Sequence, residues 1–473
     1  MLFNSSDFFI FLFVVFFSYW FVFNKNIRTQ NFFLLTSSYI FYSWWDIRFL
    51  ALIIMSTIID FTIGINIPKY DSDKKKKLLL WISISLNLIM LGFFKYYNFF
   101  IDSWINLLAA FGYKIKTLWT LKIILPVGIS FYTFQTMSYT IDIYKRKLKP
   151  TNDFISFATF VSFFPQLVAG PIERATNLLP QVLKRRNFKF QKGIEGLRLI
   201  AWGMFKKVVI ADSLAPFVND IFGNYSQFHG GTLCLGAIYF AFQIYCDFSG
   251  YSDIAIGTSK LFGFELMSNF RSPYFSRNIG EFWRKWHISL SSWFRDYLYI
   301  PLGGSRQGNL TSILNILIIF IISGLWHGAN WTFILWGFFH SILFIPLFIY
   351  KVNRKYINSV VGGKLGIPSI NEIFQISITF SLVTIGWVFF RSETVADSFN
   401  YLKIMFFDFS PIFFYKKGML YVITLLIFDY LLREKERLDF SFFGNIEIIL
   451  LSVIIFFVIW FHNQSSEFIY FQF

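Results

Sequence analysis

The chain is built from long blocks of apolar residues separated by short polar loops, and this pattern limits its fold more than any other feature. Twelve blocks are candidate membrane spans: 7–23, 31–45, 48–66, 78–98, 122–144, 195–220, 232–250, 311–326, 331–350, 372–390, 418–432 and 446–462. A perpendicular transmembrane helix needs roughly 20 apolar residues, so we expect the shorter blocks to be tilted, buried among neighbours or partly re-entrant. The pattern predicts an all-α, multi-pass integral membrane protein with about 11–12 transmembrane helices.

The distribution of charge orients the predicted helices. The formal net charge is +16, and most cations lie in alternate loops between apolar blocks, as Lys and Arg do in the cytoplasmic loops of membrane proteins. This bias predicts that both termini are extracytoplasmic, and it favours membrane topology over nucleic-acid binding as the cause of the charge. No internal repeat or low-complexity linker is visible, so we expect residues 1–473 to form a single integral membrane domain.

Two segments on the expected cytoplasmic side are too long to be simple connectors. The first, 145–194, contains the apolar stretch from Phe154 to Ala169, which we expect to re-enter the membrane or lie at its interface. The second, 251–310, is polar, aromatic and basic. In it, large apolar residues recur at spacings of three and four: Phe282, Trp286, Leu290, Trp293 and Tyr297. This period predicts a helix lying along the membrane surface.

One histidine stands at the end of an apolar block of membrane-core character. His327 closes the run that begins at Ile313. An ionisable residue at such a place is costly and is a functional-site hypothesis by default. Gly324 and Gly328 flank it, and we expect them to leave room for a substrate backbone or acyl chain.

The other four histidines give weaker signals. His229 and His462 fall in or near expected outer loops, and His340 lies within an apolar block, where a satisfied core role is expected. His287, on the basic amphipathic segment, is by itself typical of a solvated or interfacial side chain.

The chemistry open to such a site is narrow. No second histidine or carboxylate stands at ligand spacing from His327, so no metal site is expected. A Gly-x-Ser-x-Gly elbow, a Walker loop and a dinucleotide fingerprint are also missing from the sequence. A neutral imidazole in a low-dielectric cavity can act as a general base near neutral pH. It is suited to removing the proton of a hydroxyl that attacks a thioester.

Cys234 and Cys246 match no zinc or redox motif and are expected to be buried thiols.

Polar residues also interrupt two other apolar blocks. The stretch 126–135 carries small and hydroxyl residues, which allow close helix packing and interhelical hydrogen bonds. In 243–253, Gln243 and Asp247 lie one helical turn apart and share a face. The carboxylate must face protein or a wet cavity; it can cap a turn, orient a histidine or line a substrate channel, and the sequence leaves these three readings open.

Five motifs, taken together, resemble a known family: 126–135, 164–172, 245–256, 282–304 and 323–331. In this order they are similar to the membrane-bound O-acyltransferases, and most of all to the bacterial branch that O-acetylates alginate or peptidoglycan. The resemblance implies a ring of tilted helices around a thinned centre with a tunnel through it. It also implies that His327 is the key catalytic residue and that His287 is a second catalytic histidine on the cytoplasmic side.

The resemblance further implies a reaction and its partners. An acyl thioester, with acetyl-CoA the expected donor substrate and no bound cofactor, would enter on the cytoplasmic side, and His327 would act as a base or carry the acyl group. The final acceptor would be a cell-surface polysaccharide, reached through an extracytoplasmic acetyltransferase partner, in the bacterial cytoplasmic membrane and in contact with its lipid. Residues expected to line the tunnel or bind substrate are Trp326, Ser323, Gly324, Gly328, Asn330, Trp283, Arg284, Gln243, Asp247 and Tyr251.

Two alternatives remain open at this point. The related branch that moves D-alanine from a carrier protein toward teichoic acids uses similar motifs, and a basic inner face suits an acidic carrier equally well. A transporter without chemistry would also need a polar path through the membrane.

Overall fold

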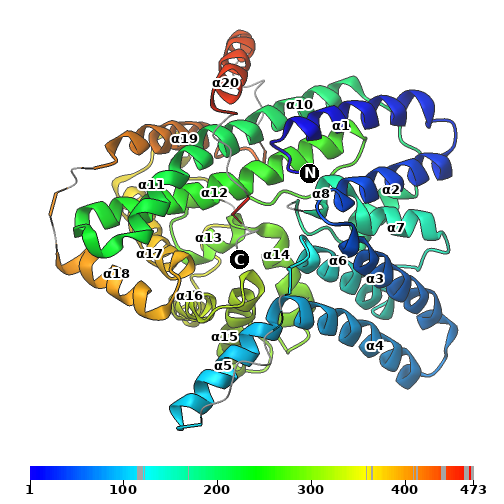
Figure 1. The fold of residues 1–473 in the computed structure, drawn as a ribbon, viewed down its shortest axis with the longest axis horizontal. Helices are drawn as coiled ribbons and strands as arrows, with labels where there is room; N and C mark the ends of the chain where they lie inside the picture. The colour runs from blue at the N-terminus through cyan, green and yellow to red at the C-terminus, as the bar shows by residue number, and fades with distance from the viewer. Residues whose placement is uncertain are drawn as a thin grey trace. The chain divides into compact units, whose positions relative to one another are not determined.

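The computed structural model describes residues 1–113, 121, 123–168, 170–357, 359–363, 366–408, 410–411, 414–437, 444–462 and 468–469. These residues form helices and no β-strand (Figure 1), so the predicted all-α fold is confirmed. The chain folds into two compact units, one of Met1–Phe190 with Ser259–Leu266 and one of Gln191–Thr258 with Met267–Phe473. The expected single integral domain is not decided by this division and stays a prediction.

Unit 1 contains the amino-terminal helices. They are α1 (Ser6–Phe17), α2 (Ile27–Ser43), α3 (Ile47–Asn66), α4 (Asp73–Leu91), α5 (Tyr97–Ala110), α6 (Ile129–Tyr144), α7 (Phe154–Ser162), α8 (Phe164–Leu167) and α9 (Ala175–Val182). Several begin at a polar residue whose side chain accepts a hydrogen bond from a backbone N–H of the first turn: Ser5, Asn26, Asp46 and Asp153. These caps satisfy donors that the helix itself leaves free.

Hydrogen bonds between side chains join three helices of unit 1. The carboxylate of Asp60 on α3 accepts from Ser83 Oγ at 2.5 Å and from Asn87 Nδ2 at 2.8 Å, both on α4. Thr136 and Thr140 of α6 contact the same groups. The polar stretch predicted at 126–135 therefore continues into an α6 face that uses its hydroxyls for helix packing, as buried polar groups in membranes commonly do.

One predicted boundary in unit 1 is wrong for a local reason, and the expected re-entrant or interfacial position of the stretch from Phe154 stays a prediction. The span expected at 122–144 begins as a helix only at Ile129, because Gly128 has φ +75°, a left-handed conformation that does not continue a helix backward. The stretch from Phe154 is two short helices with a break at Phe163, just before Pro165 in the first turn of α8. Ala169 lies outside the described residues.

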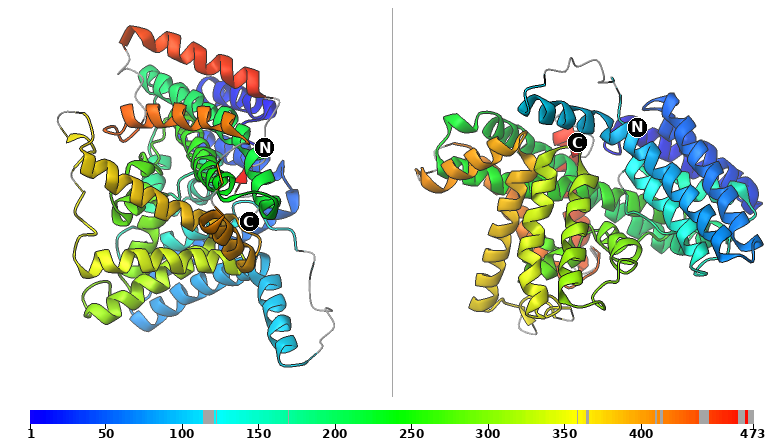
Figure 2. Two further views of the ribbon diagram at one scale, coloured as in Figure 1. Left: turned by 90° about the vertical axis from the view of Figure 1, so that its left-hand side faces the viewer. Right: turned by 90° about the horizontal axis from the view of Figure 1, so that it is seen from below.

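Unit 2 contains the remaining helices. They are α10 (Phe190–Met204, whose first residue belongs to unit 1), α11 (Asp212–Gly223), α12 (Gly230–Leu261, whose last residues belong to unit 1), α13 (Ile279–Lys285), α14 (Ile288–Phe294), α15 (Asn309–His327), α16 (Trp331–Ile349), α17 (Ile370–Arg391), α18 (Val395–Phe407), α19 (Met419–Leu431) and α20 (Glu447–Phe461). α15, α16, α17 and α18 lie side by side (Figure 2). A π-helical segment, Phe205–Ala211, joins α10 to α11.

Seven helices among the described residues are long and apolar enough to cross a membrane. They are Ile47–Lys69, Asp73–Ala110, Gly230–Leu261, Asn309–His327, Trp331–Ile349, Ile370–Arg391 and Gly444–Phe461. Each coincides with a predicted span. The other five predicted spans fall on α1, α2, α6 and α19, which are shorter, and on the helical stretch from α10 to α11. The protein is a multi-pass membrane protein, whereas the ring and its tunnel stay predictions.

Candidate active site

His327 is the last residue of α15, and a three-residue connection leads from it into α16. Asn330 caps α16, because its side chain accepts from the backbone N–H of Thr332 at 3.1 Å. Its Nδ2 also donates to the carbonyl of Glu393 at 2.9 Å, just beyond the end of α17. Asn330, predicted to bind substrate, thus holds the connection that positions His327.

Aromatic rings surround the His327 imidazole. The side chain is buried, and its ring centre lies 5.0 Å from Trp326, 5.1 Å from Trp336 on α16 and 5.3 Å from Phe390 on α17. Three helices therefore supply an apolar environment to one imidazole. Electrostatic interactions and hydrogen bonds are stronger in such an environment than in water.

The two glycines beside His327 have a packing role. A Cβ on Gly324 would overlap the carbonyl oxygen of Phe333, and a Cβ on Gly328 would overlap the Phe333 ring. We predicted that these glycines leave room for substrate, but Phe333 of α16 fills that space. They are glycine because α15 and α16 approach each other closely, as small residues allow in membrane helices. Ser323, the residue before Gly324, is also buried in α15.

His287 lies in a break between two short helices. The period of large residues predicted one continuous helix from Phe282 to Tyr297, and this is wrong. α13 ends at Lys285, His287 has φ +43°, and α14 begins at Ile288. A left-handed conformation is uncommon for a residue other than glycine and is typical of functional sites whose surroundings hold it in place.

Backbone hydrogen bonds from a distant segment hold this break. The N–H of Ile288 donates to the carbonyl of Asn269 at 2.9 Å, and the N–H of Arg271 donates to the carbonyl of Lys285 at 3.0 Å. The segment before α13 thus runs alongside the break and takes up backbone groups that a continuous helix would have paired internally.

The His287 imidazole is fully buried and neutral. Burial lowers its pKa from 6.5 to about 3. Its Nδ1 lies 3.0 Å from Asn269 Oδ1, and its Nε2 has no hydrogen-bond partner among the described residues. The ring of Phe248 on α12 packs edge-on against it at 4.6 Å. The segment around His287 by itself predicts a solvated or interfacial side chain, and the complete burial of the imidazole shows that this is wrong.

The structure brings His287 and His327 together. Their ring centres are 6.4 Å apart, and Trp326 contacts both, at 5.7 Å and 5.0 Å. Three of the residues predicted from the sequence and its family resemblance thus form one buried cluster. We take it as the candidate active site.

Further buried polar groups continue from this cluster. Trp283, predicted to line the tunnel, lies 5.6 Å from Trp336 and 5.1 Å from His340 between ring centres. Both nitrogens of His340 and the indole N–H groups of Trp283 and Trp336 have no hydrogen-bond partner among the described residues. We expected a satisfied core role for His340, and the structure shows a buried imidazole packed among aromatic rings, with no hydrogen-bond partner among the described residues. The apolar sequence around His340 gives no sign that its nitrogens lack hydrogen bonds.

Three other predicted residues, Arg284, Asp247 and Tyr251, have partners within the protein. Arg284 donates to the carbonyl of Asn353 at 2.5 Å. Asp247 accepts from Lys207 Nζ at 2.6 Å and from the backbone N–H of Ile469 at 2.7 Å. The ring of Tyr251 lies beside the same lysine. Gln243 is buried on the same helix, and its Oε1 has no partner among the described residues.

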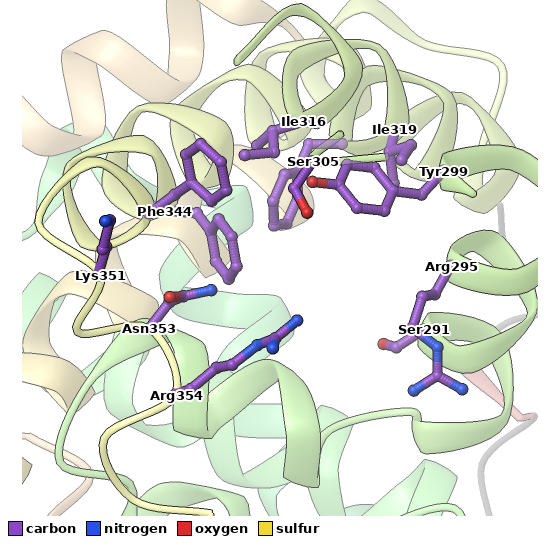
Figure 3. Close-up of a pocket in the computed structure, with 12 residues that line it drawn as sticks. Ser291, Arg295, Tyr299, Ser305, Ile316, Ile319, Phe344, Lys351, Asn353 and Arg354 are labelled. Atoms are coloured by element: carbon purple, nitrogen blue, oxygen red, sulfur yellow. The ribbon is translucent and has the colours of Figure 1, made fainter. Parts of the chain in front are cut away.

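A cavity of about 480 Å³ lies beside the continuation of this cluster (Figure 3). Its apolar wall comes from α15 and α16, and its polar wall carries the cations Arg295, Lys351 and Arg354. Figure 3 shows Arg354 extending into the cavity opposite Tyr299. Phe320 lines the cavity and also lies 5.4 Å from Trp283, so the cavity wall is one ring away from the polar groups that lead to His327.

The spanning helices define a multi-pass membrane protein, and its candidate site holds two buried imidazoles, one at the end of a spanning helix and one between two short helices. Within the described part of the chain, no group of three His, Cys, Asp or Glu residues could hold a metal ion.

Comparison with known proteins places this site in a family. The model of the membrane-bound O-acyltransferase family matches residues 88–357, which include both histidines. The chain is 40% identical over 403 residues to a probable alginate O-acetylase AlgI of Azotobacter vinelandii, covering 85% of this chain and 77% of the relative. It is 36% identical over 434 residues to a peptidoglycan O-acetyltransferase of Helicobacter pylori, covering 86% and 80%.

A more distant relative is also found. The chain is 29% identical over 282 residues to a teichoic acid D-alanyltransferase of Streptococcus thermophilus, covering 56% of this chain and 68% of the relative. The protein belongs to the membrane-bound O-acyltransferase family and is an acyltransferase.

Proposed function

We propose that this protein takes an acetyl group from a cytoplasmic thioester, acetyl-CoA, and passes it across the bacterial cytoplasmic membrane for O-acetylation of a cell-surface polysaccharide. The observation that carries the proposal is the buried pair of His287 and His327, 6.4 Å apart between ring centres. Relatives named for alginate and peptidoglycan O-acetylation support the acceptor class.

The cavity lined by Arg295, Lys351 and Arg354 suits the donor. Its cations match the phosphates of coenzyme A, since guanidinium and ammonium groups form charge-assisted hydrogen bonds with phosphate. The acyl end would extend past Phe320 and Trp283 toward Trp336, whose ring contacts His327. Basic residues on this face also agree with a cytoplasmic location.

The transfer exchanges one acyl bond for another. In the direct route, His327 takes the proton of an acceptor hydroxyl while the hydroxyl oxygen attacks the thioester carbonyl. The carbon–sulfur bond breaks, and the departing thiolate takes up a proton, leaving an ester and a free thiol. In the alternative route, an imidazole nitrogen of His327 attacks the thioester carbonyl first, the carbon–sulfur bond breaks, and the thiolate leaves as the free thiol. The acceptor hydroxyl then attacks the acetyl-imidazole, the carbon–nitrogen bond breaks, and the hydroxyl proton passes to the released imidazole. An extracytoplasmic acetyltransferase would complete delivery to the polymer.

Inside-out membrane vesicles with radiolabelled acetyl-CoA test this proposal. We expect wild-type vesicles to form an O-acetylated product and His327→Ala vesicles to form none. His229→Ala is the matched control, because His229 is exposed and pairs with Asp408 far from the histidine pair in sequence. Normal transfer by His327→Ala, at equal protein abundance, would contradict the assignment.

The second candidate function is D-alanyl transfer, which more distant relatives such as the D-alanyltransferase at 29% identity favour. A parallel incubation with D-alanyl carrier protein separates the two donors. Product labelled from the carrier and not from acetyl-CoA would replace acetyl transfer with D-alanyl transfer. Substrate movement without any covalent product would instead indicate a transporter.

A further inference from the structure

Asn269 uses its side-chain oxygen to hold the strained turn that contains His287. Its Oδ1 lies 3.0 Å from His287 Nδ1, 2.9 Å from Ser289 Oγ and 3.3 Å from the backbone nitrogen of Ser289. Its Nδ2 donates to Ser252 Oγ on α12 at 3.1 Å. The side chain is almost completely buried, so these contacts account for its polar atoms.

The contacts decide which end of the Asn269 amide faces the turn. A backbone N–H can only donate, so the atom that meets the Ser289 nitrogen must be an acceptor, and this is the amide oxygen. Ser289 Oγ also lies 3.4 Å from His287 Nδ1, but it donates its proton to the amide oxygen at 2.9 Å. His287 Nδ1 approaches that same oxygen at 3.0 Å and must therefore carry a proton. A neutral imidazole has one protonated nitrogen, which leaves Nε2 of His287 with a free lone pair.

We propose that Asn269 is the positioning residue that holds His287 as its Nδ1–H tautomer, so that Nε2 can accept a hydrogen bond from a substrate N–H or O–H group. Nε2 is buried and has no partner among the described residues, and Trp326, whose ring contacts both His287 and His327, places it in the candidate active site. The identity of the accepted group rests on the proposed function, whereas the tautomer rests on the contacts of Asn269 alone.

The tautomer can be read directly. Protein labelled with [15Nδ1]histidine is reconstituted in lipid and measured by solid-state NMR, and subtraction of the His287→Asn spectrum isolates His287, one of five histidines. We expect a protonated Nδ1 in wild type and loss of that signal in Asn269→Ala. We also expect the kcat/KM for acetyl-CoA to fall roughly 10- to 100-fold in Asn269→Ala, as for a lost or inverted buried hydrogen bond.

Two further variants separate positioning from general stability. Asn269→Asp keeps an acceptor oxygen toward His287 and should keep the Nδ1–H signal and recover most of the activity. Ser268→Ala, at the neighbouring residue, removes hydrogen bonds to Glu436 and Arg437 but none to His287, and should leave both readouts unchanged.

Several results would overturn the proposal. An unprotonated Nδ1 in the wild-type protein would do so alone, even if Asn269→Ala does not fold. Equal losses of activity in Asn269→Ala and Asn269→Asp, with the Nδ1–H signal of His287 unchanged in both, would show that Asn269 has a purely structural role. A protonated Nδ1 in a wild-type protein that transfers no acetyl group would support the tautomer and reject only the proposed substrate.

Discussion

The imidazole rings of His287 and His327 lie 6.4 Å apart, although one stands in a break between two short helices and the other ends a membrane-spanning helix. Different contacts hold the two imidazole rings in place. Asn269 binds the first, and the aromatic rings of α16 and α17 enclose the second. The site is therefore assembled by tertiary contacts from at least three segments of the chain.

The burial of His287 predicts a pH-dependent stability. Its pKa is about 3 in the folded protein against an ordinary value of about 6.5, so the unfolded chain binds the proton more readily. Its contribution to stability is complete above about pH 6.5 and declines as the pH falls below that value, by roughly 2 kcal/mol at about pH 5. The free energy of unfolding of wild type and His287→Asn is measured at about pH 6.5 and about pH 5. Lowering the pH should reduce this free energy less in the variant than in wild type. Equal losses would contradict the neutral buried state.

The close approach of α15 and α16 predicts that Gly324→Ala is destabilising. The new Cβ would overlap the carbonyl of Phe333, so the helices must separate, at a cost of about 1–3 kcal/mol. Gly92→Ala is the matched control, since a Cβ there meets no atom within 4 Å, and it should be neutral or slightly stabilising. Thermal unfolding in detergent measures both. A melting temperature for Gly324→Ala equal to that of Gly92→Ala would refute the packing role.

The cationic wall of the cavity predicts a specific kinetic change. Arg354→Gln removes a charge that extends into the cavity, and we expect the KM for acetyl-CoA to rise roughly 5- to 10-fold with little change in kcat. Arg306→Gln is the control, because Arg306 is exposed and does not line the cavity. Initial rates at varied acetyl-CoA concentration decide the matter. The same KM in both variants would exclude this cavity as the donor site.

The buried ion group around Lys207 predicts a large loss of stability on its removal. Lys207 Nζ lies 2.7 Å from Asp212 and 2.6 Å from Asp247, and all three side chains are buried. Lys207→Met would leave two carboxylates without their cation, at a cost of about 3–5 kcal/mol. The double variant Lys207→Met with Asp247→Asn should recover part of this loss.

The control for that experiment is a surface pair. Lys192 lies 3.5 Å from Glu195, and both are partly exposed, so Lys192→Met should change stability by less than about 1 kcal/mol. Denaturant unfolding in detergent compares the variants. A Lys207→Met protein as stable as Lys192→Met would show that the buried group is not an ionic one.

Local sequence predicted the features that depend on local patterns. The apolar blocks predicted the spanning helices because the cost of placing polar groups in lipid acts on each segment separately. His327 stood out for the same reason, as an ionisable residue beside an apolar run. His287 became a strong candidate only through the family resemblance, since the residues around it are typical of an ordinary amphipathic helix.

Other features depended on partners that are distant in the chain. The break at His287 exists because residues 269–271 bind its backbone, and no periodicity within 282–297 reveals that. The aromatic rings around His340, the packing of Phe333 over Gly324 and Gly328, and the contact of Asp247 with Ile469 likewise involve residues from different segments.

The sequence by itself thus determined the membrane-spanning character and the helical class and marked His327 as a site candidate, because hydrophobic transfer and the cost of a buried imidazole are properties of short segments. Only the tertiary structure decided that His287 is buried, strained and bonded to Asn269 beside His327. Hydrogen bonds and ring contacts need groups within a few ångströms of one another, and only the folded chain brings these groups to that distance.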